Sequence, residues 1–333
     1  MDLNKIIIWG HTLHDHTHSY IHNAFYRTLK YMGYKTYWFS TNGENNYNNE
    51  KLDNFDNVLF IVHGREAKNL PINNSSIYLC HNIDFTGDSK KIPNNHIKKD
   101  IYIKDNIGID IKNIIYFQVY ISDCITRDIE DKNLKYHYIN KSLKTLYFPW
   151  ATDLLPFEID KNINNINNFK SKNISNFIGC ETKPWKIYKS KLNKFNIKYY
   201  NYGGNFKSNN KSIQDNIKLI QESIITPSLQ NDWQVNHEYI PCRIFKNISY
   251  GKMGITNNKA VNKLFDNKLI YSNNIEELII KGLEFEKNKN KNKNNLLKEL
   301  MIEVRDKHTY INRIDFIFDF LKNKNIYISK QIS

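Results

Sequence analysis

Apolar and polar positions alternate along this chain in short blocks, and the blocks predict strands separated by helices. The segment KIIIWG (5–10) is an apolar run of strand length that ends at a glycine. A helical pattern covers residues 19–32, and Gly33 suits a helix C-terminus. Further β-rich runs follow at residues 35–40, 57–64, 76–82 and 114–122. This order predicts a parallel sheet with helical crossovers.

The same pattern begins again in the second half of the chain. The predicted strands there are residues 174–180, 197–204 and 224–227, and the predicted helices are residues 184–195, 212–223 and 305–323. The segment CRIFKNISYGKMGIT (242–256) predicts a helix, a turn and a strand. We therefore expect two α/β units in tandem.

The boundary between the units is predicted where this pattern stops. Residues 146–160 contain Pro149 and Pro156, and an Asn/Lys-rich stretch follows at residues 161–174. The predicted domains are residues 1–155 and 156–305, each Rossmann-like, and residues 306–333 are predicted to form a helix that packs back on the first domain.

Histidines are concentrated after the first predicted strand. Five of the chain's 11 histidines lie between His11 and His22. Ligands of an open parallel sheet bind at the C-terminal ends of its strands, so this loop is a candidate site. The strand ends at His63, His81 and Asp84 are candidates for the acceptor side of such a site.

Three interpretations of these histidines stay open. His18 and His22 share a helix face at a spacing that can hold zinc, although no further ligands follow at a recognised spacing, so we predict no bound metal. In a catalytic loop, a histidine at the start of the helix could instead remove a proton from a hydroxyl, oriented by Asp15 or Asp84. The histidines could also be polar residues of a loop without a chemical role.

A second candidate site lies between residues 231 and 258. Arg243 and Lys246 are three residues apart on one side of a short predicted helix, where both could contact a diphosphate. Glu238 could accept hydrogen bonds from a sugar or a ribose. Alternatively, Arg243 pairs with Glu238 and has a structural role only.

Composition and missing motifs exclude several classes of protein. The net charge of +14 coincides with an excess of Asn, Lys, Ile and Tyr that is typical of an AT-rich genome, so no specific nucleic-acid partner is predicted. The four cysteines form no CxxC pair, and no apolar run is long enough to span a membrane. No glycine-rich phosphate loop of the ATPase or dehydrogenase type occurs, and no DxD.

Three stretches together resemble nucleotide-sugar glycosyltransferases of the GT-B type, in a CgeB-like variant that also occurs in large DNA viruses. The first stretch is the strand, histidine loop and helix that end at MGYKTYWF (32–39). The second is EYIPCRIFKNISYG (238–251), which resembles the donor segment E-x7-E of the family, although Lys246 replaces its second glutamate. The third is a group of shorter motifs, namely IGCETKPWKIY, NYGG and the terminal HTYINRIDFIFDFL.

The resemblance implies two Rossmann-like domains that face each other across a cleft, with the acceptor on the first and the donor on the second. It also implies roles for individual residues. The implied catalytic residues are His18, Asp15 and His16. The implied donor-binding residues are Gly179, Lys183, Gly203, Gly204, Gln234, Glu238, Arg243, Lys246, Ser249 and Tyr250.

The implied reaction transfers a sugar from a nucleoside diphosphate sugar to a hydroxyl of a glycan or glycoconjugate, without a cofactor or metal ion. With His18 as base the reaction inverts the sugar, whereas a retaining reaction would need no protein base. A different group transfer, such as epimerisation or phosphorolysis, and a non-catalytic carbohydrate- or nucleotide-binding protein of the same fold are the alternatives. A cytoplasmic location, in a host cell if the protein is viral, and peripheral membrane contact are further expectations.

Overall fold

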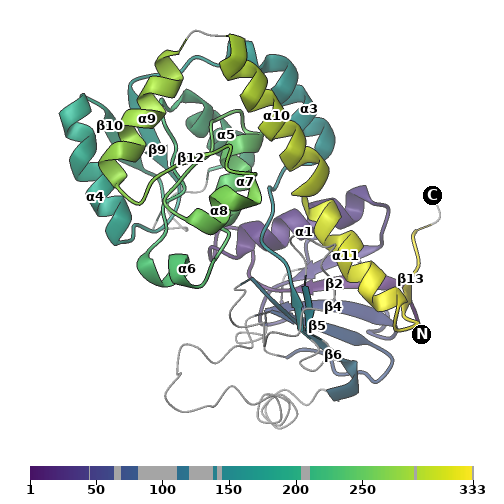
Figure 1. Ribbon diagram of the computed structural model, residues 1–333. Helices are drawn as coiled ribbons and strands as arrows, with labels where there is room; N and C mark the ends of the chain where they lie inside the picture. Colours follow the sequence, from purple (N-terminus) through teal and green to yellow (C-terminus); the bar gives the residue numbers. More distant parts are fainter. Residues whose placement is uncertain are drawn as a thin grey trace. The chain divides into compact units, whose positions relative to one another are not determined.

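The chain divides into two compact units in the computed structural model. The structure describes residues 1–44, 46–63, 69–81, 111–119, 138–140, 145–203, 211–288 and 291–331. Unit 1 consists of Met1–Phe148 and Arg313–Ser333, and unit 2 of Pro149–Asn312. Unit 2 thus begins at Pro149 and unit 1 resumes at Arg313, whereas the sequence-based prediction placed these two boundaries after residues 155 and 305 (Figure 1).

Unit 1 is built on a sheet with the strand order β3-β2-β4-β5-β6-β8-β7. The bounds are β2 (Lys5–Trp9), β3 (Thr36–Phe39), β4 (Val58–His63), β5 (Ile77–His81), β6 (Ile114–Gln118), β7 (Tyr138–Asn140) and β8 (Thr145–Tyr147). All pairs are parallel except β7 with β8. The predicted parallel sheet is therefore confirmed, and its apolar runs are the strands that are buried on both faces.

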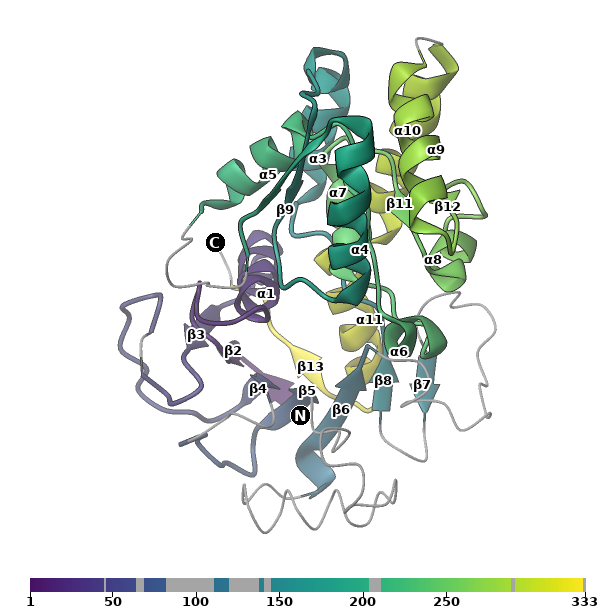
Figure 2. The same cartoon turned by 90° about the vertical axis from the view of Figure 1, so that its left-hand side faces the viewer.

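Helix α1 (Ser19–Tyr31) follows β2 and packs next to β3 (Figure 2). Its buried apolar residues Ile21, Ala24, Phe25 and Leu29 recur at the spacing of one helix face. The helix ends at Gly33, whose φ of 85° is readily adopted only by glycine. The predicted helix over residues 19–32 is thus confirmed.

The end of the chain completes unit 1. Strands β1 (Asp2–Leu3) and β13 (Tyr327–Ile328) pair in parallel, so both ends of the chain lie together (Figure 1). Helix α11 (Tyr310–Lys322) contributes Phe316, whose ring lies 6.3 Å from that of Phe148. The short 3-10 helix η2 (Ile111–Asn113) precedes β6.

Unit 2 contains two parallel strand pairs and the helices around them. The strands are β9 (Ile174–Phe177), β10 (Lys198–Asn201), β11 (Ile255–Thr256) and β12 (Ile270–Tyr271), in the pairs β9 with β10 and β11 with β12. The helices are α3 (Pro156–Asn165), η4 (Ile166–Asn168), α4 (Lys183–Leu192), η5 (Asn193–Phe195), α5 (Ile213–Glu222), α6 (Asp232–Asn236), α7 (Cys242–Ser249), α8 (Lys259–Leu264), α9 (Ile275–Lys287) and α10 (Lys291–Lys307).

The predicted strand at residues 224–227 joins the two pairs without regular strand geometry of its own. The N–H of Ile224 donates to the carbonyl of Ile174 in β9, and the N–H of Ser228 donates to Ile255 in β11. The loops that follow β9, residue 228 and β11 therefore leave the same edge of unit 2.

Two sequence-based expectations for unit 2 are wrong. The run EKNKNKNKNN (286–295) has a composition that is typical of a solvated loop, but α9 extends to Lys287 and α10 begins at Lys291. The helix predicted over residues 305–323 is divided, because Arg305–Lys307 end α10 and α11 begins at Tyr310.

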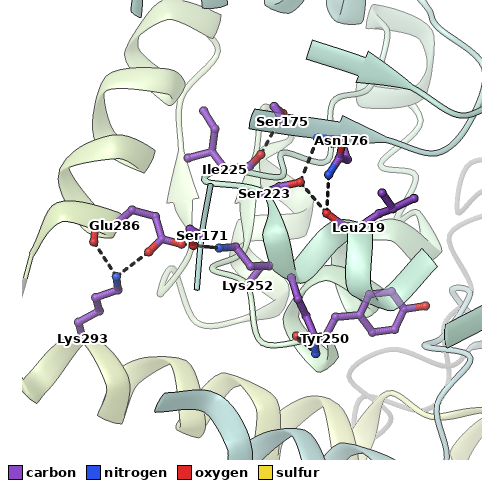
Figure 3. A network of polar contacts seen from close by, with 11 residues as sticks. Ser171, Ser175, Asn176, Leu219, Ser223, Ile225, Tyr250, Lys252, Glu286 and Lys293 are labelled. Carbon is purple, nitrogen blue, oxygen red and sulfur yellow. Dashed lines mark hydrogen bonds and ion pairs between the residues drawn. The ribbon is translucent and has the colours of Figure 1, made fainter. Parts of the chain in front are cut away.

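A polar network connects the two helices that contain the described residues of this run (Figure 3). The ammonium groups of Lys252 and Lys293 lie 2.5 and 2.7 Å from the carboxylate of Glu286, and Lys252 also donates to Ser171 over 3.0 Å. Burial lowers the pKa of Lys252, and Glu286 opposes this effect. The end of α9 is thereby fixed to the start of α10.

Candidate functional site

The histidine loop of unit 1 is organised by its own hydrogen bonds. His18 is the N-cap residue of α1, and the Ser19 hydroxyl donates to the His16 carbonyl over 2.6 Å. Gly10 ends β2, and a Cβ atom at this position would lie only 2.3 Å from the His22 ring. Glycine is needed here because the His22 ring occupies that space.

Four imidazole rings from this loop form a stack. The His16 ring lies 4.2 Å from that of His11 and 5.0 Å from that of His18, between centroids. The His22 ring stacks on His11 at 5.9 Å, and the His81 ring at the end of β5 meets His18 edge-on at 5.3 Å. We call these five residues the histidine cluster.

The contacts between His16 and His18 assign their tautomers. The backbone N–H of His18 donates to Nδ1 of His16 over 3.2 Å, so this Nδ1 is an acceptor without a proton. Nδ1 of His18 also lies 3.2 Å from the same atom. His18 can donate to it only in the tautomer that carries the proton on Nδ1, and in that tautomer the lone pair lies on Nε2.

Two members of the histidine cluster, His18 and His22, are uncharged near neutral pH. Burial, with smaller effects of His16 and His11, lowers the pKa of His18 to about 3. Burial also lowers the pKa of His22 well below its usual value. His18 is therefore neutral at any pH near 7.

The remaining predicted residues of unit 1 are placed as follows. Asp15, expected to orient the histidine, is exposed and accepts a hydrogen bond from Thr12. His81 is 3% exposed and stacks on Phe117 at 4.8 Å. His63 is the last residue of β4 and pairs in register with His81. Asp84 lies outside the described residues.

In unit 2, two glycines and an arginine pack closely after β9. A Cβ atom at Gly203 would lie 2.1 Å from the backbone of Gly179, and one at Gly179 would lie 2.6 Å from Nη2 of Arg243. The predicted residues Gly179, Gly203 and Arg243 are thus together. Gly204 lies outside the described residues.

Arg243 is held in place by neutral groups. Its Nη1 donates to the Ile178 carbonyl over 3.0 Å, and its guanidinium lies 4.4 Å from the ring centroid of Phe177 and 5.4 Å from that of Trp185. No carboxylate of the described chain lies within ion-pair distance of it, so the alternative pairing with Glu238 is absent there. Burial lowers the pKa of Arg243, but a guanidinium remains charged.

The start of α4 adds further donors beside Arg243. Thr182 is the N-cap residue, and its buried hydroxyl has no hydrogen-bond partner within the described segments. The predicted donor residue Lys183 is exposed at the first position of the helix. A helix N-terminus, a hydroxyl and a guanidinium without a carboxylate partner together suit an anion such as phosphate.

Lys246 differs from Arg243, because it pairs with a buried carboxylate. Its Nζ lies 2.8 Å from Oδ2 of Asp153, and Oδ1 of the same carboxylate accepts a 2.6 Å hydrogen bond from the Tyr250 hydroxyl. Burial opposes the charge of Lys246, but Asp153 outweighs it and raises the pKa of Lys246. Ser249 is also buried and shares a 2.7 Å hydrogen bond with Thr152. These side chains join the start of unit 2 to α7.

Gln234 and Glu238 lie in the loop between residues 228 and 242. The Gln234 side chain accepts from the N–H of Asn231 and closes a capping box at the start of α6. Glu238 is exposed and has a φ of 50°. Its carboxylate is therefore at the surface of this loop.

Sequence reasoning missed the residues that hold Arg243 and Lys246. Asp153 lies in the segment expected to be a mere connection, and Phe177 and Trp185 were expected only to be parts of a strand and a helix. An aromatic residue two positions before Gly179 was the available signal for a cation-binding ring.

The described residues contain neither a cluster of metal ligands nor a membrane-spanning helix. Within the described residues, no group of three or more His, Cys, Asp or Glu side chains has the geometry to hold a metal ion. No described helix is long and apolar enough to cross a membrane. A surface cavity of about 460 Å³ lies between α8, β12 and α9, away from every predicted residue.

Comparison with known proteins identifies the fold. No protein-family model matches the chain, and no curated protein sequence does. An alpha-glucosyltransferase in complex with UDP and a 13-mer DNA has a similar structure, with a TM-score of 0.57 and 8% identity over 94% of this chain and 99% of the other. The N-terminal domain of Candida albicans trehalose-6-phosphate phosphatase gives a TM-score of 0.52 and 10% identity over 96% and 97%. The chain thus has the GT-B fold of two Rossmann-like domains, as predicted.

Proposed function

We propose that this protein is a glycosyltransferase that moves a sugar from a nucleoside diphosphate sugar to a hydroxyl group, without a metal ion. The observation that carries the proposal is Arg243, a cation without a carboxylate partner in the described chain, beside the N-terminus of α4. The GT-B fold and the UDP named with a similar structure agree with a nucleotide donor.

Unit 2 would bind the donor through its diphosphate. As the bond between the sugar C1 and the diphosphate oxygen breaks, negative charge develops on the leaving group. Arg243, the Thr182 hydroxyl and the first N–H groups of α4 would stabilise this charge. Lys246 would contribute less than the sequence suggested, because Asp153 neutralises it.

Unit 1 would supply the base of an inverting reaction. The acceptor oxygen would form the new bond to C1, and its proton would pass to Nε2 of His18, the atom that bears the lone pair. His16 would act as a positioning residue by fixing the tautomer of His18. A retaining reaction, in which no protein base acts, is the alternative.

The acceptor is proposed to be a hydroxyl of a glycan or glycoconjugate. The DNA in the similar alpha-glucosyltransferase makes a hydroxyl on a nucleic acid the second acceptor to examine. A non-catalytic binder of the same fold would bind a nucleotide sugar but would neither transfer nor hydrolyse it.

Donor binding can be measured by the thermal stabilisation that nucleoside diphosphates and nucleotide sugars produce, with and without EDTA. One nucleotide should stabilise the protein strongly, and EDTA should not change the effect. Arg243→Ala should weaken its binding about tenfold or more, because a charge-assisted phosphate contact is lost. Arg305→Ala is the matched control, since Arg305 on α10 pairs with Asp160 on α3 and with its neighbour Asp306. Equal affinity in wild type and Arg243→Ala would exclude this diphosphate site.

A further inference from the structure

The loop between residue 228 and α7 presents an aromatic pair at the surface. Trp233 on α6 is 45% exposed, which is unusual for so large an apolar side chain. Its ring stacks on that of His237, with centroids 4.2 Å apart and planes 29° apart. Nδ1 of His237 also lies 2.7 Å from the Trp233 carbonyl oxygen, and this contact fixes the His237 ring.

This loop is held by many hydrogen bonds, although its surface is exposed. The Gln230 side chain donates to the Tyr239 carbonyl over 2.6 Å, and Asn258 donates to the same carbonyl over 3.0 Å. Asn257 accepts from the N–H of Gln230 and donates to its carbonyl. The aromatic pair is therefore presented in one conformation, and a flat ring bound there would lose little freedom of the loop.

The loop adjoins the proposed diphosphate site through the topology of unit 2. Residues 224–228 lie beside β9, so the loop that follows them leaves the sheet next to the loop containing Gly179. At its other end the loop leads into α7, from which Arg243 reaches back to the carbonyl of Ile178. A ligand that carries both a diphosphate and a planar ring fits this arrangement.

We propose that Trp233, supported by His237, is the stacking surface for the nucleobase of the donor. The inference rests on the proposed function, because it needs the diphosphate at Arg243. Stacking on tryptophan suits any base, so the base is not selected by this contact alone.

The test compares nucleoside diphosphates with inorganic pyrophosphate, which lacks the ring. Trp233→Ala should weaken the binding of UDP, or of whichever diphosphate binds best, about tenfold. It should leave the affinity for pyrophosphate unchanged. Trp233→Phe should keep the nucleotide affinity within about threefold, because a smaller ring still stacks. Phe157→Ala is the matched control, since Phe157 on α3 is 55% exposed.

Fluorescence gives a second readout. The nucleotide should quench tryptophan emission in the wild type, and the quenching should largely disappear in Trp233→Phe although binding persists. An equal loss of nucleotide and pyrophosphate affinity in Trp233→Ala, or no loss of either, would overturn the stacking role. If no nucleotide and no pyrophosphate binds the wild type, the proposed function itself fails, and this inference with it.

Discussion

Arg243 and Lys246 lie three residues apart on α7, yet the protein uses their charges differently. Arg243 is surrounded by two aromatic rings and a carbonyl group, whereas Lys246 is bound to the buried carboxylate of Asp153. The identity of two basic residues on one helix face is readable from the sequence. Their partners are not, because Asp153 and Phe177 come from distant parts of the chain.

Removing the ammonium group of Lys246 should destabilise unit 2. In Lys246→Met the charge of Asp153 stays buried without its partner, and we expect a loss of about 3 kcal/mol in the free energy of unfolding. In an Asp153→Asn background the same substitution should cost much less. Chemical denaturation of the four proteins measures this coupling, and additive losses would mean that the pair does not act as a unit.

Two predictions follow from the state of His18, and the first concerns the pH dependence of stability. Its pKa is about 3 in the folded protein and about 6.5 in the unfolded chain, so the unfolded chain takes up the proton first as the pH falls. The free energy of unfolding should therefore decrease from pH 6.5 towards pH 3, by at most about 1.4 kcal/mol per pH unit from this residue. His18→Asn should show a shallower decrease; an unchanged slope would contradict the burial of a neutral imidazole.

The second prediction for His18 concerns transfer. His18→Ala should bind the donor as the wild type does and lose at least about 100-fold in the rate of transfer, the usual contribution of a general base. His16→Ala should lose part of the rate and shift its pH profile, since His16 fixes the tautomer of His18. Full activity of His18→Ala would favour the retaining alternative.

At the scale of elements, the sequence predicted the strands β2 to β6, β9 and β10 and the helices α1, α4, α5, α7 and α11, because apolar runs and glycines mark their limits. It missed the helices α3, α6, α8 and α9. It also missed all but the last residues of α10, a helix whose buried residues Leu297, Leu300, Met301 and Val304 have helical spacing among asparagines and lysines. Its N-terminal end is fixed by Lys293 and Glu286, a contact between two helices that no local pattern reveals.

The packing of the loops after β9 and β10 gives a prediction at this scale. In Gly203→Ala the new methyl group would collide with the backbone of Gly179, which cannot move aside as a flexible side chain would. We expect Arg243 to be displaced and nucleotide affinity to fall about tenfold or more. Gly33→Ala is the control for a glycine lost outside these loops, since it strains the backbone at the end of α1 (φ 85°) without a collision, no atom lying within 4 Å of a Cβ there. Retained affinity in Gly203→Ala would show that the two loops separate easily.

At the scale of the whole molecule, the charge is distributed unevenly. Residues 149–312 hold 26 lysines and arginines and 16 acidic residues, a net charge of +10 out of the +14 of the chain. An AT-rich genome would enrich lysine in both units alike, so composition alone does not explain this excess. The sequence-based prediction considered only the total charge of the chain and did not compare the two predicted domains.

We expect this excess to produce weak binding of random duplex DNA that depends on salt. The logarithm of the affinity should fall linearly with that of the salt concentration, with a slope of about −0.9 for each phosphate contact. Titration in salt from about 50 to 200 mM measures the slope. Binding that does not weaken with salt would contradict an origin in this excess of charge.

The return of the chain to unit 1 after unit 2 has a consequence for engineering of the gene. The two ends of unit 2 lie together, since the N–H of Thr152 donates to the carbonyl of His308 over 3.1 Å. Unit 2 is therefore one continuous segment whose first and last residues lie close together. A single DNA segment could encode it, and a short linker could join the two parts of unit 1 in its absence. The corresponding DNA segment of a related gene could then replace the proposed donor-binding unit, while unit 1 with its histidine cluster is retained.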